Sequence, residues 1–229
     1  MNRDEIEALR ALLAPTGWPE RARTFARALR VSTARQGGSP GGLLLVGTPA
    51  EEPWHLAAHL DDESRLSGLP ELAPTLIRWN APPEAPPHLR IGLDRLAAAR
   101  RGETLFVVSP EAAPVPLLER ADDARRAGAT ILALNQGDPE LDGLAHETLT
   151  VAPDATTPVS FTVAQHLVSV AAGDPAAARR GLRDRLAHWL DVVAGSSVLA
   201  SGADAPQTPQ GELRSPTGGP GSGRPRRPA

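Results

Sequence analysis

The chain has 229 residues, of which 41% are hydrophobic and 22% charged, so we expect one domain with a complete core, followed by a tail. A formal net charge of −3 predicts no basic face for phosphate backbones, and hence no nucleic-acid partner. The sequence has no cysteine, which excludes disulfides and thiolate chemistry, and no lysine, which excludes a Schiff-base lysine and a Walker-type phosphate loop.

Two further classes are excluded by the pattern of apolar residues. No apolar run approaches the roughly 18 residues of a membrane-spanning helix, so we expect no membrane partner. The acidic start, MNRDEIEALR, is not typical of a signal peptide. We therefore expect a cytoplasmic protein.

Two helices are predicted before the first strand. Asn2 or Asp4 can cap the first of them. The second is predicted over Pro19–Arg35, with its apolar stripe formed by Ala22, Phe25, Ala26 and Leu29. A glycine-rich break follows, so residues 1–36 are interpreted as a helical N-terminal arm.

Short apolar runs predict a parallel sheet. The pattern is clearest over Gly102–Leu134, where two apolar runs bracket an amphipathic helix and Gly128 supplies its C-cap. The five predicted strands are Leu43–Val46, Thr75–Trp79, Leu105–Val108, Ile131–Leu134 and Glu147–Val151.

Helical patterns fill the connections between these strands. The first of these helices is predicted to begin near Pro53. The others are predicted over Leu89–Arg100, Leu117–Ala124, a single turn within 139–145, Thr157–Ala172, and a last stretch from Asp174 to about Val193. The alternation predicts an α/β fold, a three-layer α-β-α sandwich with a five-stranded parallel sheet, an N-terminal helical pair and two C-terminal helices. We assign residues 1–194 to this domain. Residues 195–229 are too poor in apolar side chains to fold, so they are predicted to be a disordered Pro/Gly/Arg-rich tail.

This arrangement resembles the sugar isomerase (SIS) domain over roughly Ile6 to Gly173, most of all the phosphoheptose isomerase branch. In that branch a strand ends in G-N-G-G-S-A before a helix with Q-H-F-A-A-E-L, and here GGLLLVG precedes Trp54–Leu60, WHLAAHL. The family's G-D-hydrophobic-I-S-x-S-G-x-(T or S) and A-x-x-x-G-hydrophobic-x-x-I-A-L-T are similar in outline to Gly102–Ser109 and Ala124–Asn135. Leu141–Val151 is similar to the family's L-A-E-L-A-D segment.

Both loops that hold the phosphate in this family are degenerate here. Gly47 is followed by T-P-A-E-E-P, in which the prolines lack an N–H donor and the glutamates place negative charge where an anion should sit. Ser109 is kept, but P-E-A-A-P follows it instead of S-G-x-(T or S). The resemblance implies ligand binding by Gly47, Thr48, Ser109 and Glu111, and the changed loops argue against tight binding of a sugar phosphate in the family's usual way.

The resemblance also suggests catalytic and metal-binding positions. Aldose-ketose isomerisation needs a base and a group that shuttles a hydroxyl proton. The family's metal ligand and base correspond to His55 and His59, which are four residues apart on one helix and so share a face. A late helix keeps Gln165 and His166, while the family's glutamate is not visible. The catalytic candidates are therefore His59 and His166, and the metal candidates are His55 and His59, with zinc as the metal if one binds. The alternative is that these histidines are ordinary polar or interface residues.

These observations leave three hypotheses for function. The leading one is a phosphoheptose isomerase-like protein that is non-catalytic or weakly active. It would bind a carbohydrate derivative, namely a sugar phosphate, or have a regulatory role. The alternatives are an active phosphosugar isomerase with a variant, histidine-based and zinc-dependent site, and a structural assembly module. The resemblance implies a homodimer or homotetramer, and Glu51, Glu52 and Glu111 suit a cationic or polyhydroxylated ligand.

Overall fold

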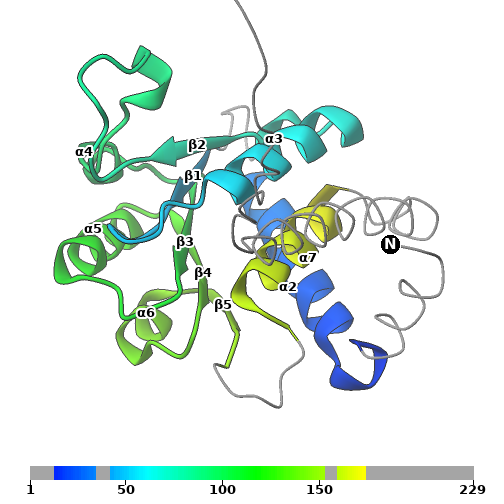
Figure 1. Ribbon diagram of the computed structural model, residues 1–229. Helices are drawn as coiled ribbons and strands as arrows, with labels where there is room; N and C mark the ends of the chain where they lie inside the picture. Colours follow the sequence, from blue (N-terminus) through cyan, green and yellow to red (C-terminus); the bar gives the residue numbers. More distant parts are fainter. Residues whose placement is uncertain (1–12, 35–41, 153–158, 174–229) are drawn as a thin grey trace, which may run out of the picture.

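The computed structural model describes residues 13–34, 42–152 and 159–173 (Figure 1). Nearly all of the first predicted helix, the predicted helix from Asp174 and the tail at 195–229 lie outside the described residues. The assignment of residues 1–194 to one domain therefore stays a prediction.

A five-stranded parallel sheet with the order β2-β1-β3-β4-β5 forms the middle layer. The prediction of five parallel strands is confirmed: β1 has the expected ends, and the ends of the other strands differ from the expected ones by at most two residues. Every residue of β1 and β3 is buried, as expected for central parallel strands covered on both faces. The strands are β1 (Leu43–Val46), β2 (Pro74–Ile77), β3 (Thr104–Ser109), β4 (Thr130–Asn135) and β5 (Glu147–Thr150).

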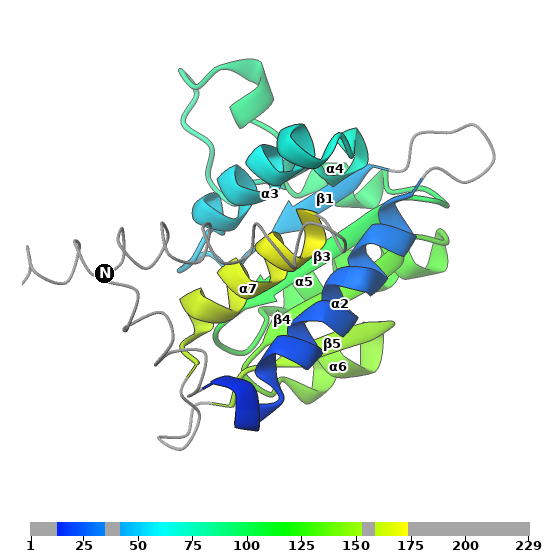
Figure 2. The ribbon, with the colours of Figure 1, turned by 90° about the vertical axis from the view of Figure 1, so that its right-hand side faces the viewer.

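Helices cover both faces of the sheet, which confirms the predicted three-layer α-β-α sandwich (Figure 2). One face carries α2 (Trp18–Thr33), α3 (Trp54–Ser67) and α7 (Phe161–Gly173). The other carries α4 (Asp94–Ala97), α5 (Val115–Arg126) and α6 (Pro139–Leu144). No helix in the described part of the chain is long and apolar enough to cross a membrane.

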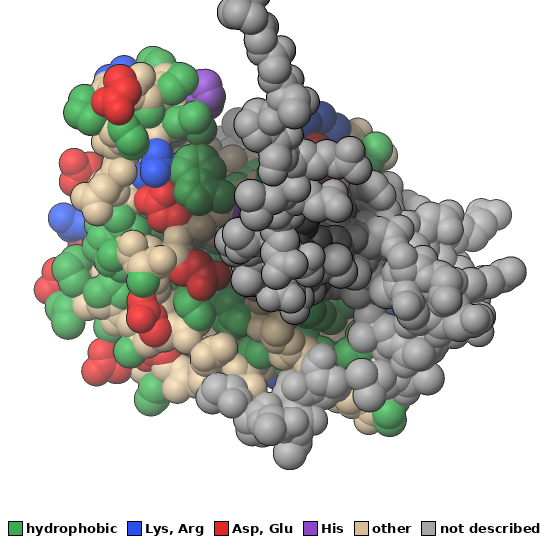
Figure 3. All heavy atoms as spheres, viewed as in Figure 1, with side chains coloured by type: hydrophobic (Ala, Val, Ile, Leu, Met, Phe, Trp, Pro, Cys, Tyr) green, Lys and Arg blue, Asp and Glu red, His purple; other side chains and the backbone are tan. Residues whose placement is uncertain are grey.

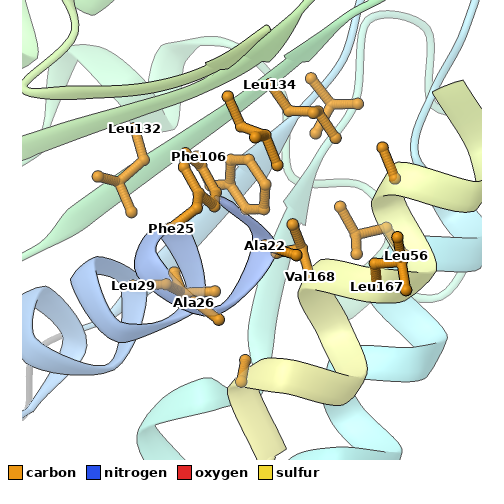
Figure 4. Close-up of a cluster of buried hydrophobic side chains, with 14 of the residues drawn as sticks. Ala22, Phe25, Ala26, Leu29, Leu56, Phe106, Leu132, Leu134, Leu167 and Val168 are labelled. Atoms are coloured by element: carbon orange, nitrogen blue, oxygen red, sulfur yellow. The ribbon is translucent and has the colours of Figure 1, made fainter. Parts of the chain in front are cut away.

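The strands supply alternate side chains to two hydrophobic cores, because successive residues of a strand point to opposite faces. Phe106 and Leu132 belong to the core under α2, α3 and α7, whereas Leu105 and Ile131 belong to the core under α4, α5 and α6. The ring of Phe25 packs against that of Phe106, with ring centroids 5.3 Å apart (Figure 4). This central contact attaches α2 to the middle of the sheet.

The predicted helix over Leu89–Arg100 is wrong. The segment contains a 3-10 turn, η3 (Pro87–Leu89), and only the short α4. Between them the backbone is paired with the end of β2, since Arg78 N donates to Ile91 O (2.8 Å) and Arg78 forms a parallel bridge with Gly92. Pairing with a strand requires extended backbone, and this tertiary contact outweighs the helical pattern.

The helix that joins β3 to β4 ends as predicted. Gly128 has a left-handed φ of +92°, and Ala129 N donates to Ala124 O (3.0 Å). These are features of a helix end closed by a glycine. The chain therefore enters β4 directly after α5.

The buried hydroxyl of Thr104 should cost stability. Thr104 is fully buried at the start of β3, and its Oγ1 has no hydrogen-bond partner among the described residues. We expect Thr104→Val to raise the free energy of unfolding by about 1 kcal/mol, because valine keeps the shape and removes an unsatisfied polar group. Denaturant unfolding measures this change. The matched control is Thr33→Val, since buried Thr33 donates to Leu29 O (2.9 Å) and its replacement should lower stability. A loss of stability in Thr104→Val would contradict the interpretation.

Candidate functional site

The candidate site lies at the carboxyl ends of β1 and β3, the point where the strand order of the sheet reverses. Ligands of open α/β sheets bind at such switch points. The loops after the two strands meet here, because the hydroxyl of Thr48 donates to Glu111 Oε1 (3.0 Å). The structure thus brings together Gly47, Thr48, Ser109 and Glu111, the four predicted ligand-binding residues, although their binding role stays a prediction.

The loop after β1 is closed on itself. Thr48 N donates to Glu51 O (3.1 Å), and Glu51 N donates to the Thr48 hydroxyl (3.2 Å). A Cβ at Gly47 would lie only 2.1 Å from Glu51 O, so glycine is needed for this close approach. The backbone amide of Thr48, which could bind an anion, is therefore already used inside the loop.

The loop after β3 is also satisfied internally. The buried Ser109 hydroxyl donates to Glu111 O (2.6 Å). Ala113 N donates to Asp138 Oδ2 (2.7 Å), while Asp138 Oδ1 accepts the amides at the start of α6. The Ser109 hydroxyl and the Ala113 amide are thus already bonded to protein acceptors.

An open pocket of about 270 Å³ adjoins this loop, between the ends of β3 and β4. It is lined by Pro110, Glu111, Ala112, Gln136, Gly137, Asp138 and Pro139. Asn135 holds one wall in place, because its side chain donates to Asp142 Oδ1 (2.7 Å) and accepts from Gly137 N (2.8 Å). Figure 3 looks onto this edge of the sheet, where several acidic side chains lie on the described surface. The side chains of Glu111, Gln136 and Asp138 are the polar groups of this lining.

A second group of side chains surrounds the carboxylate of Glu52. Its Oε2 accepts from Trp54 Nε1 (3.1 Å) and Arg78 Nε (2.9 Å), and its Oε1 accepts from Trp79 N (3.0 Å). Trp79 Nε1 donates to Gly47 O (2.8 Å), which ties this group to the loop after β1. The sequence interpretation missed Arg78 and Trp79 as site residues. The available signal was their place directly after an apolar strand, which puts them at the same edge of the sheet.

His59 and His166 meet at the interface of α3 and α7. Their ring centroids are 4.3 Å apart and their planes meet at 76°. Burial, followed by the charges of His59 and His55, lowers the pKa of His166 to about 3. Burial also lowers the pKa of His59, against an opposing effect of Asp62. Both imidazoles are therefore predominantly neutral at pH 7, so each can donate one hydrogen bond and accept one.

The residue before His166 contacts the loop after β1. Gln165, beside His166 on α7, places Nε2 3.5 Å from Glu51 Oε1 in the loop after β1. The structure thus places the predicted catalytic residues His59 and His166 together and close in sequence to groups that reach the cleft. Their catalytic role stays a prediction.

The predicted metal ligands lack a complete donor set. His55 is exposed near the start of α3. No group of three or more His, Asp or Glu suited to a metal ion occurs within residues 13–34, 42–152 and 159–173. Zinc usually takes three or four protein ligands. The described residues do not fit a zinc centre on their own, and metal binding by His55 and His59 stays a prediction.

No protein-family model matches the sequence, and no curated protein matches it. Among solved structures, the chain is similar to a candidate phosphosugar isomerase from Silicibacter pomeroyi DSS-3, with a TM-score of 0.51 and 18% identity over 84% of this chain and 54% of that one. The chain therefore spans about half the length of that protein. This likeness shows the fold, which is that of a sugar isomerase domain.

Two further solved structures are also similar. The sugar isomerase domain of an RpiR transcription factor from Sphaerobacter thermophilus gives a TM-score of 0.44 and 17% identity over 75% of this chain and 86% of that one. The Vibrio vulnificus NanR protein, solved in complex with ManNAc-6P, gives a TM-score of 0.43 and 12% identity over 88% of this chain and 71% of that one.

Proposed function

We propose that this protein binds a carbohydrate derivative without isomerising it, or with weak activity at most, and that it does not hold its ligand by a phosphate group. The observation that carries the proposal is the hydrogen bond from the Thr48 hydroxyl to the Glu111 carboxylate. This bond places a negative charge of the protein at the switch point of the sheet.

A phosphate at this point would find the donors of Thr48 and Ser109 already bonded, and the carboxylate of Glu111 beside it. The amide and hydroxyl of Thr48 and the hydroxyl of Ser109 already donate within the two loops. A phosphate and the exposed carboxylate of Glu111 would repel each other by on the order of 1 kcal/mol, because solvent screens exposed charges. A phosphate beside Glu111 therefore loses most of the binding free energy that a phosphate loop of the family would supply.

An active isomerase with a histidine-based site is the second candidate. It is favoured by the contact between His59 and His166, since a neutral imidazole can act as a general base. It is disfavoured by the closed loops, because the substrates of this reaction carry the phosphate that those loops should bind. Membership of the phosphoheptose isomerase branch, assembly as a homodimer or homotetramer and a cytoplasmic location belong to the same proposal.

Thermal unfolding and a turnover assay with sedoheptulose 7-phosphate test the proposal. We expect no turnover and no rise in Tm at millimolar concentration, because a ligand raises Tm only if it binds the native state. Glu111→Gln removes the charge but keeps the shape, and it should strengthen binding of the phosphorylated sugar about ten-fold. The control is Glu119→Gln, which changes an exposed carboxylate on α5.

Two results would overturn the proposal. Turnover by the wild type would show that the site is catalytic. A Tm that rises with the phosphorylated sugar but not with sedoheptulose itself would show that the loops still hold a phosphate.

A further inference from the structure

Trp54 is an exposed aromatic side chain held in one orientation. It is the first residue of α3 and is 38% exposed. Its Nε1 donates to Glu52 Oε2 (3.1 Å), and the Arg78 guanidinium carbon lies 4.5 Å from the ring centroid. Arg78 Nε donates to the same Glu52 oxygen (2.9 Å), so the cation on the ring is itself fixed. The Arg78 guanidinium thus lies over one face of the indole.

Hydrogen bonds connect this ring to the switch point of the sheet. Glu52 accepts from Trp79 N at the end of β2, and Trp79 Nε1 donates to Gly47 O at the end of β1. Gly47 precedes Thr48, whose hydroxyl holds Glu111 at the end of β3. A series of hydrogen bonds therefore joins the ring to the candidate site. An aromatic group fixed in advance loses little conformational entropy when a ligand stacks on it.

The charges around the Trp54 ring favour ligand groups that donate hydrogen bonds over anionic ligand groups. Arg78 is neutralised by Glu52, and their side chains are only 15% and 14% exposed. Glu51 and Glu111 are exposed residues whose carboxylates contact the neutral Gln165 amide and Thr48 hydroxyl. A carboxylate has about four acceptor sites, so both retain capacity for hydroxyl or ammonium groups of a ligand.

We propose that this edge of the sheet takes an unphosphorylated amino sugar, with the C–H face of the pyranose ring on Trp54 and the ammonium group at Glu111. This inference rests on the proposed function and adds the class of ligand. The negative face of an indole attracts polarised C–H groups, and a carboxylate pairs with an ammonium group. A phosphate at C6 weakens binding, because it brings an anion among carboxylates.

Ligand-observed NMR titrations of the full chain with D-glucosamine, D-glucose and D-glucosamine 6-phosphate test this inference. We expect glucosamine to bind most tightly and its 6-phosphate most weakly. Trp54→Ala should weaken the binding of glucosamine and of glucose about five-fold, and Trp54→Phe should recover most of that loss. Glu111→Gln should weaken the binding of glucosamine and leave the binding of glucose unchanged. The control is Leu66→Ala, which alters a residue of the same helix that is 66% exposed, and should have no effect.

The outcomes separate this inference from the function on which it rests. If glucosamine binds but Trp54→Ala leaves its Kd unchanged, the stacking site is wrong and the proposed function stands. Tighter binding of the 6-phosphate than of glucosamine overturns the ligand class. If the folded wild type binds none of the three sugars, the proposed function fails and this inference falls with it.

Discussion

Gly47→Ala is expected to lower the free energy of unfolding by about 3 kcal/mol, the largest effect among the substitutions considered. The new Cβ would lie 2.1 Å from Glu51 O and 2.6 Å from Pro53 Cδ. The first contact is with backbone, so a change of rotamer cannot relieve it. The loop would have to open, which also breaks the bond from Thr48 N to Glu51 O.

Denaturant unfolding of Gly47→Ala measures this loss, and Gly143→Ala is the matched control. Gly143 lies in α6, and a Cβ there would meet no atom within 4 Å. Alanine is the better helix former, so the control should be neutral or slightly stabilising. Equal stabilities for the two variants would mean that the loop after β1 is not closed on Gly47.

The stability of the fold should fall as the pH is lowered from 6.5 towards 3, because His166 is buried as a neutral imidazole. Its pKa is about 3 in the folded protein, against an ordinary value of 6.5. Between these values the unfolded chain binds more protons than the folded one, so stability rises with pH in this window and is complete above it. At pH 5 the titration of His166 lowers the free energy of unfolding by about 2 kcal/mol. His59 acts in the same direction, since burial lowers its pKa too.

Urea unfolding at a series of pH values measures this effect. His166→Gln should flatten the profile between pH 6.5 and pH 4, because glutamine does not titrate. The matched variant is His88→Gln, which replaces an exposed histidine in η3 and leaves His166 in place, so its profile should keep the wild-type slope. A His166→Gln profile as steep as that of the wild type would exclude His166 as the cause.

One contact lies between the parts of the fold that these two predictions test. Glu51 belongs to the loop that closes on Gly47, and its carboxylate contacts Gln165, the residue before His166 on α7.

Much of the architecture could be predicted from the order of residues, because it depends on local periodicity. The uninterrupted apolar runs at β1, β3 and β4 can only be buried on both faces, which implies a parallel sheet with helices on each side. Gly128 ends its helix for a local reason as well, since glycine adopts the left-handed conformation without strain. In the sequence, Thr48, Ser109 and Glu111 follow predicted strands. This order places them at the carboxyl edge of the sheet.

Contacts between distant segments decided the rest, and periodicity carries no information about them. The helix predicted over Leu89–Arg100 is interrupted because Arg78 pairs with Ile91 and Gly92 at the end of β2. Only the packing of α3 on α7 brings His59 to His166. The sequence alone determined that this is a layered α/β protein with altered loops at its strand ends. The tertiary structure decided which side chains meet at those loops, because that depends on distances between segments that are far apart in the chain.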